Sequence, residues 1–158
     1  MTSGTLQLVR HVKLVVDIEN RSNISVDQEK LQKIAISVME ELKLHPEQEL
    51  SLSLVDVEEM AELHQKWMNE SGPTDVMSFR LSEIAEFDFS LGDVVICPAI
   101  TQKDAIKLKK SPAQHLVFLL VHGILHLLGF DHQVASEKKN MQQQEVKLMK
   151  KITKEFKN

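Results

Sequence analysis

The sequence predicts an α+β fold, in which a mixed, mostly parallel sheet of four strands packs with about five helices. Residues 13–54 carry a strand pattern, a helix pattern and a second strand pattern, which is the order of a parallel strand pair joined by a crossover helix. Residues 116–128 are apolar nearly all round, so they predict a buried central helix. A length of 158 residues with 42% hydrophobic residues suits one domain, residues 1–158, with residues 1–12 as a lead-in that could be mobile.

The first strand, helix and second strand follow directly from side-chain periodicity. Residues 13–20 alternate in polarity, as a strand with one buried face does. Ser25 and Gln28 have the spacing of a capping box, and apolar residues then recur at helical spacing until the chain approaches Pro46. Residues 50–54 alternate leucine with serine and predict the second strand, parallel to the first.

The middle of the chain predicts a second helix and two further strands. Asp56 with Glu59 is typical of a helix N-terminus, and this helix is expected to end before a Gly-Pro pair at residues 72–73. Residues 76–81 and 91–97 have the composition of strands. The segment between them, residues 82–90, is acidic and aromatic and could form a flexible lip.

Three further helices complete the prediction. A short helix is expected from Pro98 to about residue 110, because proline is favoured at the first helical position. Ser111 and Gln114 form a capping box for the apolar helix. Residues 135–156 predict a final amphipathic helix with a lysine-rich outer face.

The apolar helix ends in a histidine motif, H-G-I-L-H-L-L-G-F-D-H, at residues 122–132. His122 and His126 are four residues apart, so on a helix they share one face and can bind one ion. Gly129 fits the left-handed end of that helix, and the turn can bring His132 back toward the pair. Three neutral imidazoles suit one Zn²⁺ per chain, although Ni²⁺ or another imidazole-preferring ion would also fit. The free fourth position for water is typical of a catalytic zinc.

Two classes of zinc hydrolase have related motifs. The metzincin peptidases share the histidine spacing but have a glutamate as general base at the second position, where this chain has Gly123. With glycine there, the motif resembles the signature of the YbeY family, bacterial zinc-dependent endoribonucleases of ribosomal RNA maturation and ribosome quality control. Residues 73–79, P-T-D-V-M-S-F, and 91–97, L-G-D-V-V-I-C, resemble two further segments of that family in the same order. The resemblance covers nearly the whole chain.

The resemblance implies hydrolytic cleavage of single-stranded RNA, such as the 3′ end of 16S ribosomal RNA, with small-subunit RNA and ribosomal proteins as partners. A zinc ion lowers the pKa of its bound water to about 7, which would supply the attacking hydroxide. Two alternatives stay open: a ribosome-associated binding factor whose zinc is structural, and a metalloprotease-like hydrolase.

Secondary site residues are predicted around the histidines. Asp131 could orient a histidine or bond the turn, and Ser78 could contact a phosphate or a water from the start of a strand. His64 and His115 have no partner at ligand spacing, so we expect packed or surface histidines. The family commonly has a phosphate-contacting arginine five residues before P-T-D/N, and this chain has Met68 there.

Charge and cysteine content limit the partners and the compartment. A net charge of −4 argues against indiscriminate nucleic-acid binding, so local features such as Lys66 or Arg80 must hold an RNA. The single Cys97 cannot form an internal disulfide and the N-terminus has no signal-peptide pattern, which fits a reducing cytoplasm. No apolar run approaches the roughly 18 residues of a membrane span.

Overall fold

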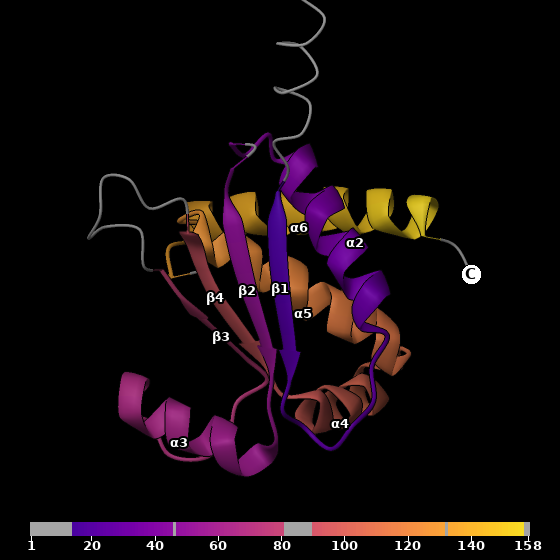
Figure 1. Cartoon of the computed structure of the whole chain (residues 1–158). Helices are drawn as coiled ribbons and strands as arrows, with labels where there is room; N and C mark the ends of the chain where they lie inside the picture. The colour runs from indigo at the N-terminus through magenta and orange to yellow at the C-terminus, as the bar shows by residue number, and fades with distance from the viewer. Residues whose placement is uncertain (1–13, 46, 81–89, 132, 157–158) are drawn as a thin grey trace, which may run out of the picture.

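The structure, a computed structural model, describes residues 14–45, 47–80, 90–131 and 133–156. Within these ranges it contains the four strands and five helices that the sequence predicts (Figure 1). In chain order they are β1 (Val15–Asn20), α2 (Gln28–Glu41), β2 (Glu49–Leu54), α3 (Val57–Met68), β3 (Val76–Phe79), β4 (Ser90–Ile96), α4 (Pro98–Leu108), α5 (Pro112–Leu127) and α6 (Ala135–Glu155). The predicted lead-in, Pro46, residues 82–89 of the predicted lip and His132 lie outside the described residues; Ser90 begins β4.

The sheet has the strand order β1-β2-β4-β3, which confirms a mixed and mostly parallel arrangement. β1 pairs in parallel with β2, and β2 pairs in parallel with β4. β3 is antiparallel to β4 and lies at the edge. Because β3 and β4 are antiparallel, the end of β3 at Phe79 lies opposite Asp93, which is near the start of β4.

Helices cover one face of this sheet in two layers. α2 packs on β1 and α5 packs on β4 and β3, while α6 packs across α2 and α5 on the outside. Figure 1 shows α5 and α6 behind the strands and α2 beside β1. The main core lies between these layers and includes fully buried residues from the strands and from α5: Leu50, Leu52, Leu54, Val94, Ile96, Leu120, Ile124 and Leu125.

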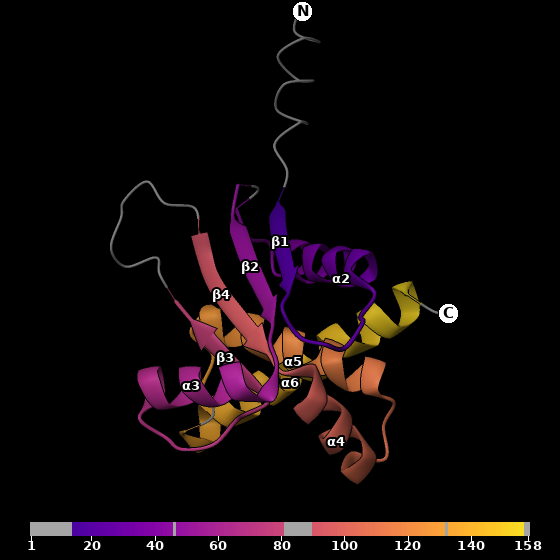
Figure 2. The same cartoon turned by 60° about the horizontal axis from the view of Figure 1, so that its bottom comes forward.

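The opposite face of the sheet is polar along most of its length. The alternation in β1 and β2 turns Asp17, Glu19, Ser51 and Ser53 away from the main core, and these residues are exposed or half-buried. At one end α3 covers a second, smaller core made of Val55, Met60, Met77, Val95 and Cys97. Both views place α3 and α4 at this same end of the sheet, at the carboxyl ends of the parallel strands (Figures 1 and 2).

α5 has the two ends that its sequence predicts. The Ser111 hydroxyl accepts from the Gln114 backbone N–H at 3.1 Å, and the Gln114 side chain accepts from the Ser111 N–H at 3.3 Å, which makes a complete capping box. At the other end Gly129 has φ +95°, and the N–H of Phe130 reaches the carbonyl of Leu125 at 3.1 Å. This is a Schellman ending, which reverses the chain directly after the second histidine of the motif.

One predicted cap is wrong. The side chain that caps α2 is Asp27, which accepts from the Lys30 N–H at 3.1 Å, and not Ser25. An aspartate directly before the first helical residue does the same work as a serine, and its negative charge also favours the helix N-terminus. No helix in the described ranges is both long enough and apolar enough to cross a membrane.

Gly123 sets how closely α5 approaches the sheet. A Cβ at this position would lie 2.7 Å and 3.1 Å from the two methyl groups of Val94 and 3.3 Å from the Ser78 hydroxyl. Val94 is fully buried and its branched side chain has little freedom to move. Position 123 therefore faces the sheet, where a metzincin-type glutamate has no room, and this argues against the peptidase hypothesis.

Replacing Gly123 by alanine is expected to destabilise the fold. Overpacking a tight core costs about 1–3 kcal/mol, which exceeds the roughly 1 kcal/mol by which alanine favours a helix over glycine. Urea denaturation should show a lower free energy of unfolding for Gly123→Ala. In the Gly123→Ala/Val94→Ala double variant the added methyl group gains room. The double variant should therefore lose less free energy of unfolding than the sum of the losses of the two single variants. A loss equal to that sum would contradict this packing.

Candidate metal centre

His122 and His126 lie together on one face of α5, as their spacing predicts. Their Nε2 atoms are 3.1 Å apart, and their rings meet edge to face with centroids 4.6 Å apart. Two imidazole nitrogens bound at about 2.1 Å to one tetrahedral zinc lie roughly 3.4 Å apart, so the pair is spaced for a shared ion. The predicted third ligand, His132, lies outside the described residues and stays a prediction.

Glu145 on α6 holds the first of these rings. Its Oε2 is 2.7 Å from Nδ1 of His122, and the Glu145 residue is only 6% exposed. A carboxylate on Nδ1 accepts the ring proton there and leaves Nε2 as the lone-pair nitrogen that can bind a metal. The Phe118 ring stacks on His122 at 6.0 Å between centroids and limits its rotation from the other side. The imidazole is therefore fixed in both tautomer and orientation.

The sequence motifs do not include Glu145, although the pattern of α6 carries a signal for it. Met141, Glu145 and Leu148 are all buried on α6 and are spaced four and three residues apart, which places them on one helical face. A carboxylate in the apolar stripe of an amphipathic helix needs a partner, because a buried charge without one is costly. The partner could not be identified from spacing, since α6 and α5 meet only in the folded chain.

Ser78 of β3 and Arg80, just after that strand, join the site to the sheet. The Ser78 hydroxyl donates to the carbonyl of Gly123 at 3.0 Å. Arg80 donates from Nε to the carbonyl of Leu127 at 3.0 Å and from Nη2 to the carbonyl of His126 at 3.4 Å. The His126 carbonyl also accepts from the Gly129 N–H at 3.0 Å, so Arg80 adds side-chain bonds to the turn that ends α5 after the second histidine.

The histidines open into a cleft of about 780 Å³ that β3, α3, α5 and the turn after α5 surround. Ser78 and Asp131, the two secondary residues predicted from the sequence, both line it. Their chemical roles stay predictions. The wall also has apolar residues, such as Met77 and Phe130, and further acidic and polar residues, which include Glu70, Thr74, Asp75 and Gln133. An anionic substrate therefore needs a cation in this cleft.

Of the two cations considered for phosphate contact, Arg80 lines the cleft and Lys66 does not. Met68, at the position where the family commonly has arginine, is 46% exposed and lies in the wall. Arg80 is also in the wall, so it brings a guanidinium to the cleft from another element. Lys66 is not among the lining residues, and its ammonium lies 5.3 Å from the centre of the Trp67 ring.

Three remaining candidates for chemistry can be placed. The Cys97 side chain packs in the smaller core, and its burial there raises the pKa of the thiol. It is therefore a poor nucleophile. His64 is packed as expected, with Nδ1 2.8 Å from the Gly72 carbonyl and Nε2 3.0 Å from Glu70. The expectation for His115 is incomplete: it is buried, but Asp75 and Asp104 from two other elements bring their carboxylates to it. Sequence spacing cannot detect partners on separate elements.

Comparisons with known proteins agree with this architecture. The sequence model of the family described as Endoribonuclease YbeY matches residues 17–153. The chain belongs to the YbeY family. Endoribonuclease YbeY of Thermobifida fusca is 42% identical over 133 residues, which cover 80% of this chain and 86% of that protein. Endoribonuclease YbeY of Acidothermus cellulolyticus is 42% identical over 139 residues, or 81% and 85% of the two chains. The solution structure of TM1509 from Thermotoga maritima superposes with a TM-score of 0.62 at 26% identity, over 89% of this chain and 91% of that one.

In this YbeY family chain, Glu145→Gln is expected to weaken metal binding. The amide keeps the size of the side chain but removes the charge that fixes the His122 tautomer, and loss of such a partner typically costs about 10–100-fold in metal affinity. Competition with a chromogenic zinc chelator measures the affinity. Glu40→Gln, an exposed glutamate on α2, is the matched control and should bind as wild type does. Equal affinity for the two variants would contradict the role of Glu145.

Proposed function

We propose that this chain is a metal-dependent endoribonuclease that hydrolyses phosphodiester bonds of single-stranded RNA in ribosomal RNA maturation. Its relatives in Thermobifida fusca and Acidothermus cellulolyticus both carry the name Endoribonuclease YbeY. The 16S 3′ end as cleavage site, a role in ribosome quality control, ribosomal proteins of the small subunit as partners, and the cytoplasm as location are finer parts of the same proposal. So is the assignment of residues 1–158 to one domain.

The pair of imidazole nitrogens 3.1 Å apart, with a buried carboxylate behind one of them, is the observation on which the proposal rests. His122, His126 and His132 are the proposed ligands of one Zn²⁺, with Ni²⁺ as an alternative. When bound, such an ion supplies hydroxide at neutral pH and polarises a phosphoryl oxygen. The protein supplies rigid geometry, because Glu145 holds the His122 ring and Arg80 bonds the backbone carbonyls of His126 and Leu127.

Charge in the cleft restricts where an RNA phosphate can lie. Glu70, Asp75 and Asp131 in the wall repel a phosphate, whereas Arg80 attracts it at the end of α5 beside His126. The scissile phosphate is therefore drawn toward Arg80, beside the histidines. We propose that Asp131, two residues beyond Gly129, orients a histidine of the motif, and that Ser78 acts as a positioning residue through its bond to Gly123.

A second candidate function is a ribosome-associated binding factor in which the zinc is structural. Met68 favours it, because a methionine cannot form the paired hydrogen bonds that an arginine makes with a phosphate. Arg80 also uses two of its nitrogens on backbone carbonyls of α5. This hypothesis predicts that removing the metal lowers the melting temperature strongly and that the loaded protein cleaves no RNA.

The His126→Ala variant tests the first candidate. It is expected to lose cleavage of a labelled precursor 16S RNA 3′-end fragment, by at least about 100-fold, because two ligands no longer converge on one ion. His126→Ala, purified in parallel with wild type, also reveals any contaminating nuclease. His45→Ala, at an exposed histidine after α2, is the matched control and should cleave as wild type does. Undiminished cleavage by His126→Ala would refute the proposal, and absence of cleavage by the zinc-loaded wild type, alone and with small subunits, would favour the binding factor.

A further inference from the structure

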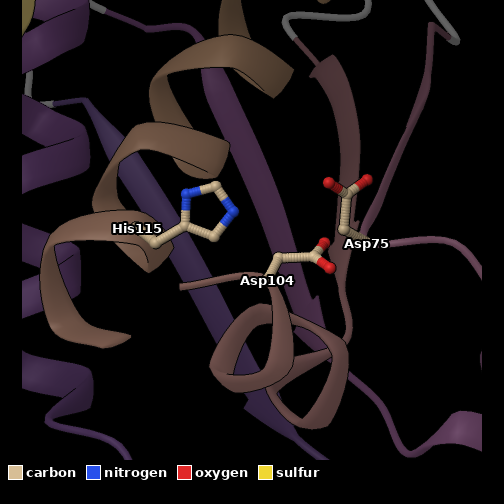
Figure 3. A group of neighbouring side chains, drawn as sticks. All are labelled: Asp75, Asp104 and His115. Atoms are coloured by element: carbon tan, nitrogen blue, oxygen red, sulfur yellow. The ribbon is translucent and has the colours of Figure 1, made fainter. Parts of the chain in front are cut away.

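Asp75, Asp104 and His115 converge from three separate elements (Figure 3). Asp75 directly precedes β3, Asp104 lies on α4 and His115 lies in the first turns of α5. One ligand atom from each side chain lies within 4.8 Å of the others. We propose that these three side chains form a second divalent-cation site, of the kind that binds Zn²⁺ or Mn²⁺.

His115 is the observation that points to a ligand. It is only 4% exposed, and within the described part of the chain neither of its ring nitrogens has a hydrogen-bond partner. A buried polar group without a partner is unfavourable, so native structures nearly always satisfy such groups. In Figure 3 one ring nitrogen points toward the two carboxylates. A cation bound between the carboxylates and this nitrogen would give the buried ring nitrogen the partner that it lacks.

The two carboxylates are also in an unfavourable arrangement without a cation. Two negative charges that face each other in a half-buried place repel, and a divalent cation neutralises both. Asp75 is already held in place, since its Oδ1 accepts from the Val76 N–H at 2.8 Å and from the Thr74 hydroxyl at 3.4 Å. Burial, and next the charge of Lys110, lower the pKa of His115 against the opposing effect of the two aspartates. The ring is therefore neutral, which is the form that binds metals.

The donor set indicates the class of ion. One imidazole nitrogen with two carboxylate oxygens suits borderline ions such as Zn²⁺ and Mn²⁺ better than Ca²⁺ or Mg²⁺, which prefer oxygen ligands alone. Ligand atoms on one such ion lie roughly 3–4 Å apart. Because the three atoms already lie within 4.8 Å of one another, binding requires side-chain movements of only about an ångström.

The second ion would not act on the same bond as the first. His115 and His122 are seven residues apart on α5, which is roughly 10 Å along a helix, whereas paired catalytic metals are about 3.5–4 Å apart. The ion would instead join α4, α5 and the chain before β3. Because Asp75 also lines the cleft beside the histidine pair, this junction fixes one wall of the cleft.

Counting bound ions tests the proposal without relying on nuclease activity. The full chain is stripped with a chelator, loaded with Zn²⁺ or Mn²⁺, desalted and analysed by mass spectrometry of the metal content. Wild type should bind two ions per chain, and Asp104→Asn and His126→Ala should each bind one. Asp17→Asn, an exposed aspartate on β1, is the matched control and should bind two. The His126→Ala/Asp104→Asn double variant should bind none, whatever the outcome of the RNA cleavage assay.

Two further readouts cover variants that fold poorly. Added Mn²⁺ should raise the melting temperature of His126→Ala by several degrees and leave that of the double variant unchanged. In the wild-type chain, the ¹⁵N chemical shift of one ring nitrogen of His115 should move during a Zn²⁺ titration as coordination begins. An unmoved His115 signal, or an Asp104→Asn variant with the wild-type metal content, would overturn the proposal and leave His115 as a packed histidine.

Discussion

The close approach of α5 to β4 at Gly123 is the constraint on which the rest of the structure depends. Without a side chain at this position, the helix lies so close to Val94 that any Cβ there would force a shift. That contact brings the carbonyl of Gly123 to Ser78 and the last turn of α5 to Arg80. The histidines are then held on the solvent-facing part of a helix whose other sides are buried. The fixed geometry of the histidine pair therefore follows from backbone packing as much as from the side chains that contact it.

Local patterns in the sequence predicted the elements and their order well. The strand alternation, the capping box at Ser111 and the glycine at residue 129 each depend on interactions within a few residues, and each is confirmed. The spacing of His122 and His126 is also local, because one helical turn separates them. The misplaced cap at Ser25 shows the limit of such patterns, since the adjacent Asp27 offered an equally good side chain.

Contacts between distant elements could not be predicted in the same way. Glu145 lies 23 residues beyond His122, and the pairing depends on how α6 crosses α5. The group around His115 draws on α4, α5 and the chain before β3, with no common period. Glu145 and His115 are both polar residues on helix faces that are otherwise largely apolar. A buried polar side chain needs a partner, but the sequence pattern does not say which residue that partner is.

The position of Glu145 also has a consequence for folding. Glu145 lies 23 residues beyond His122, so the carboxylate reaches the His122 ring only when α6 has docked across α2 and α5. A chain in which α6 is undocked would keep both histidines one turn apart on α5 but would lose the group that aligns the first of them. The outer helical layer is therefore part of the site, because its Glu145 side chain contacts a histidine of the pair.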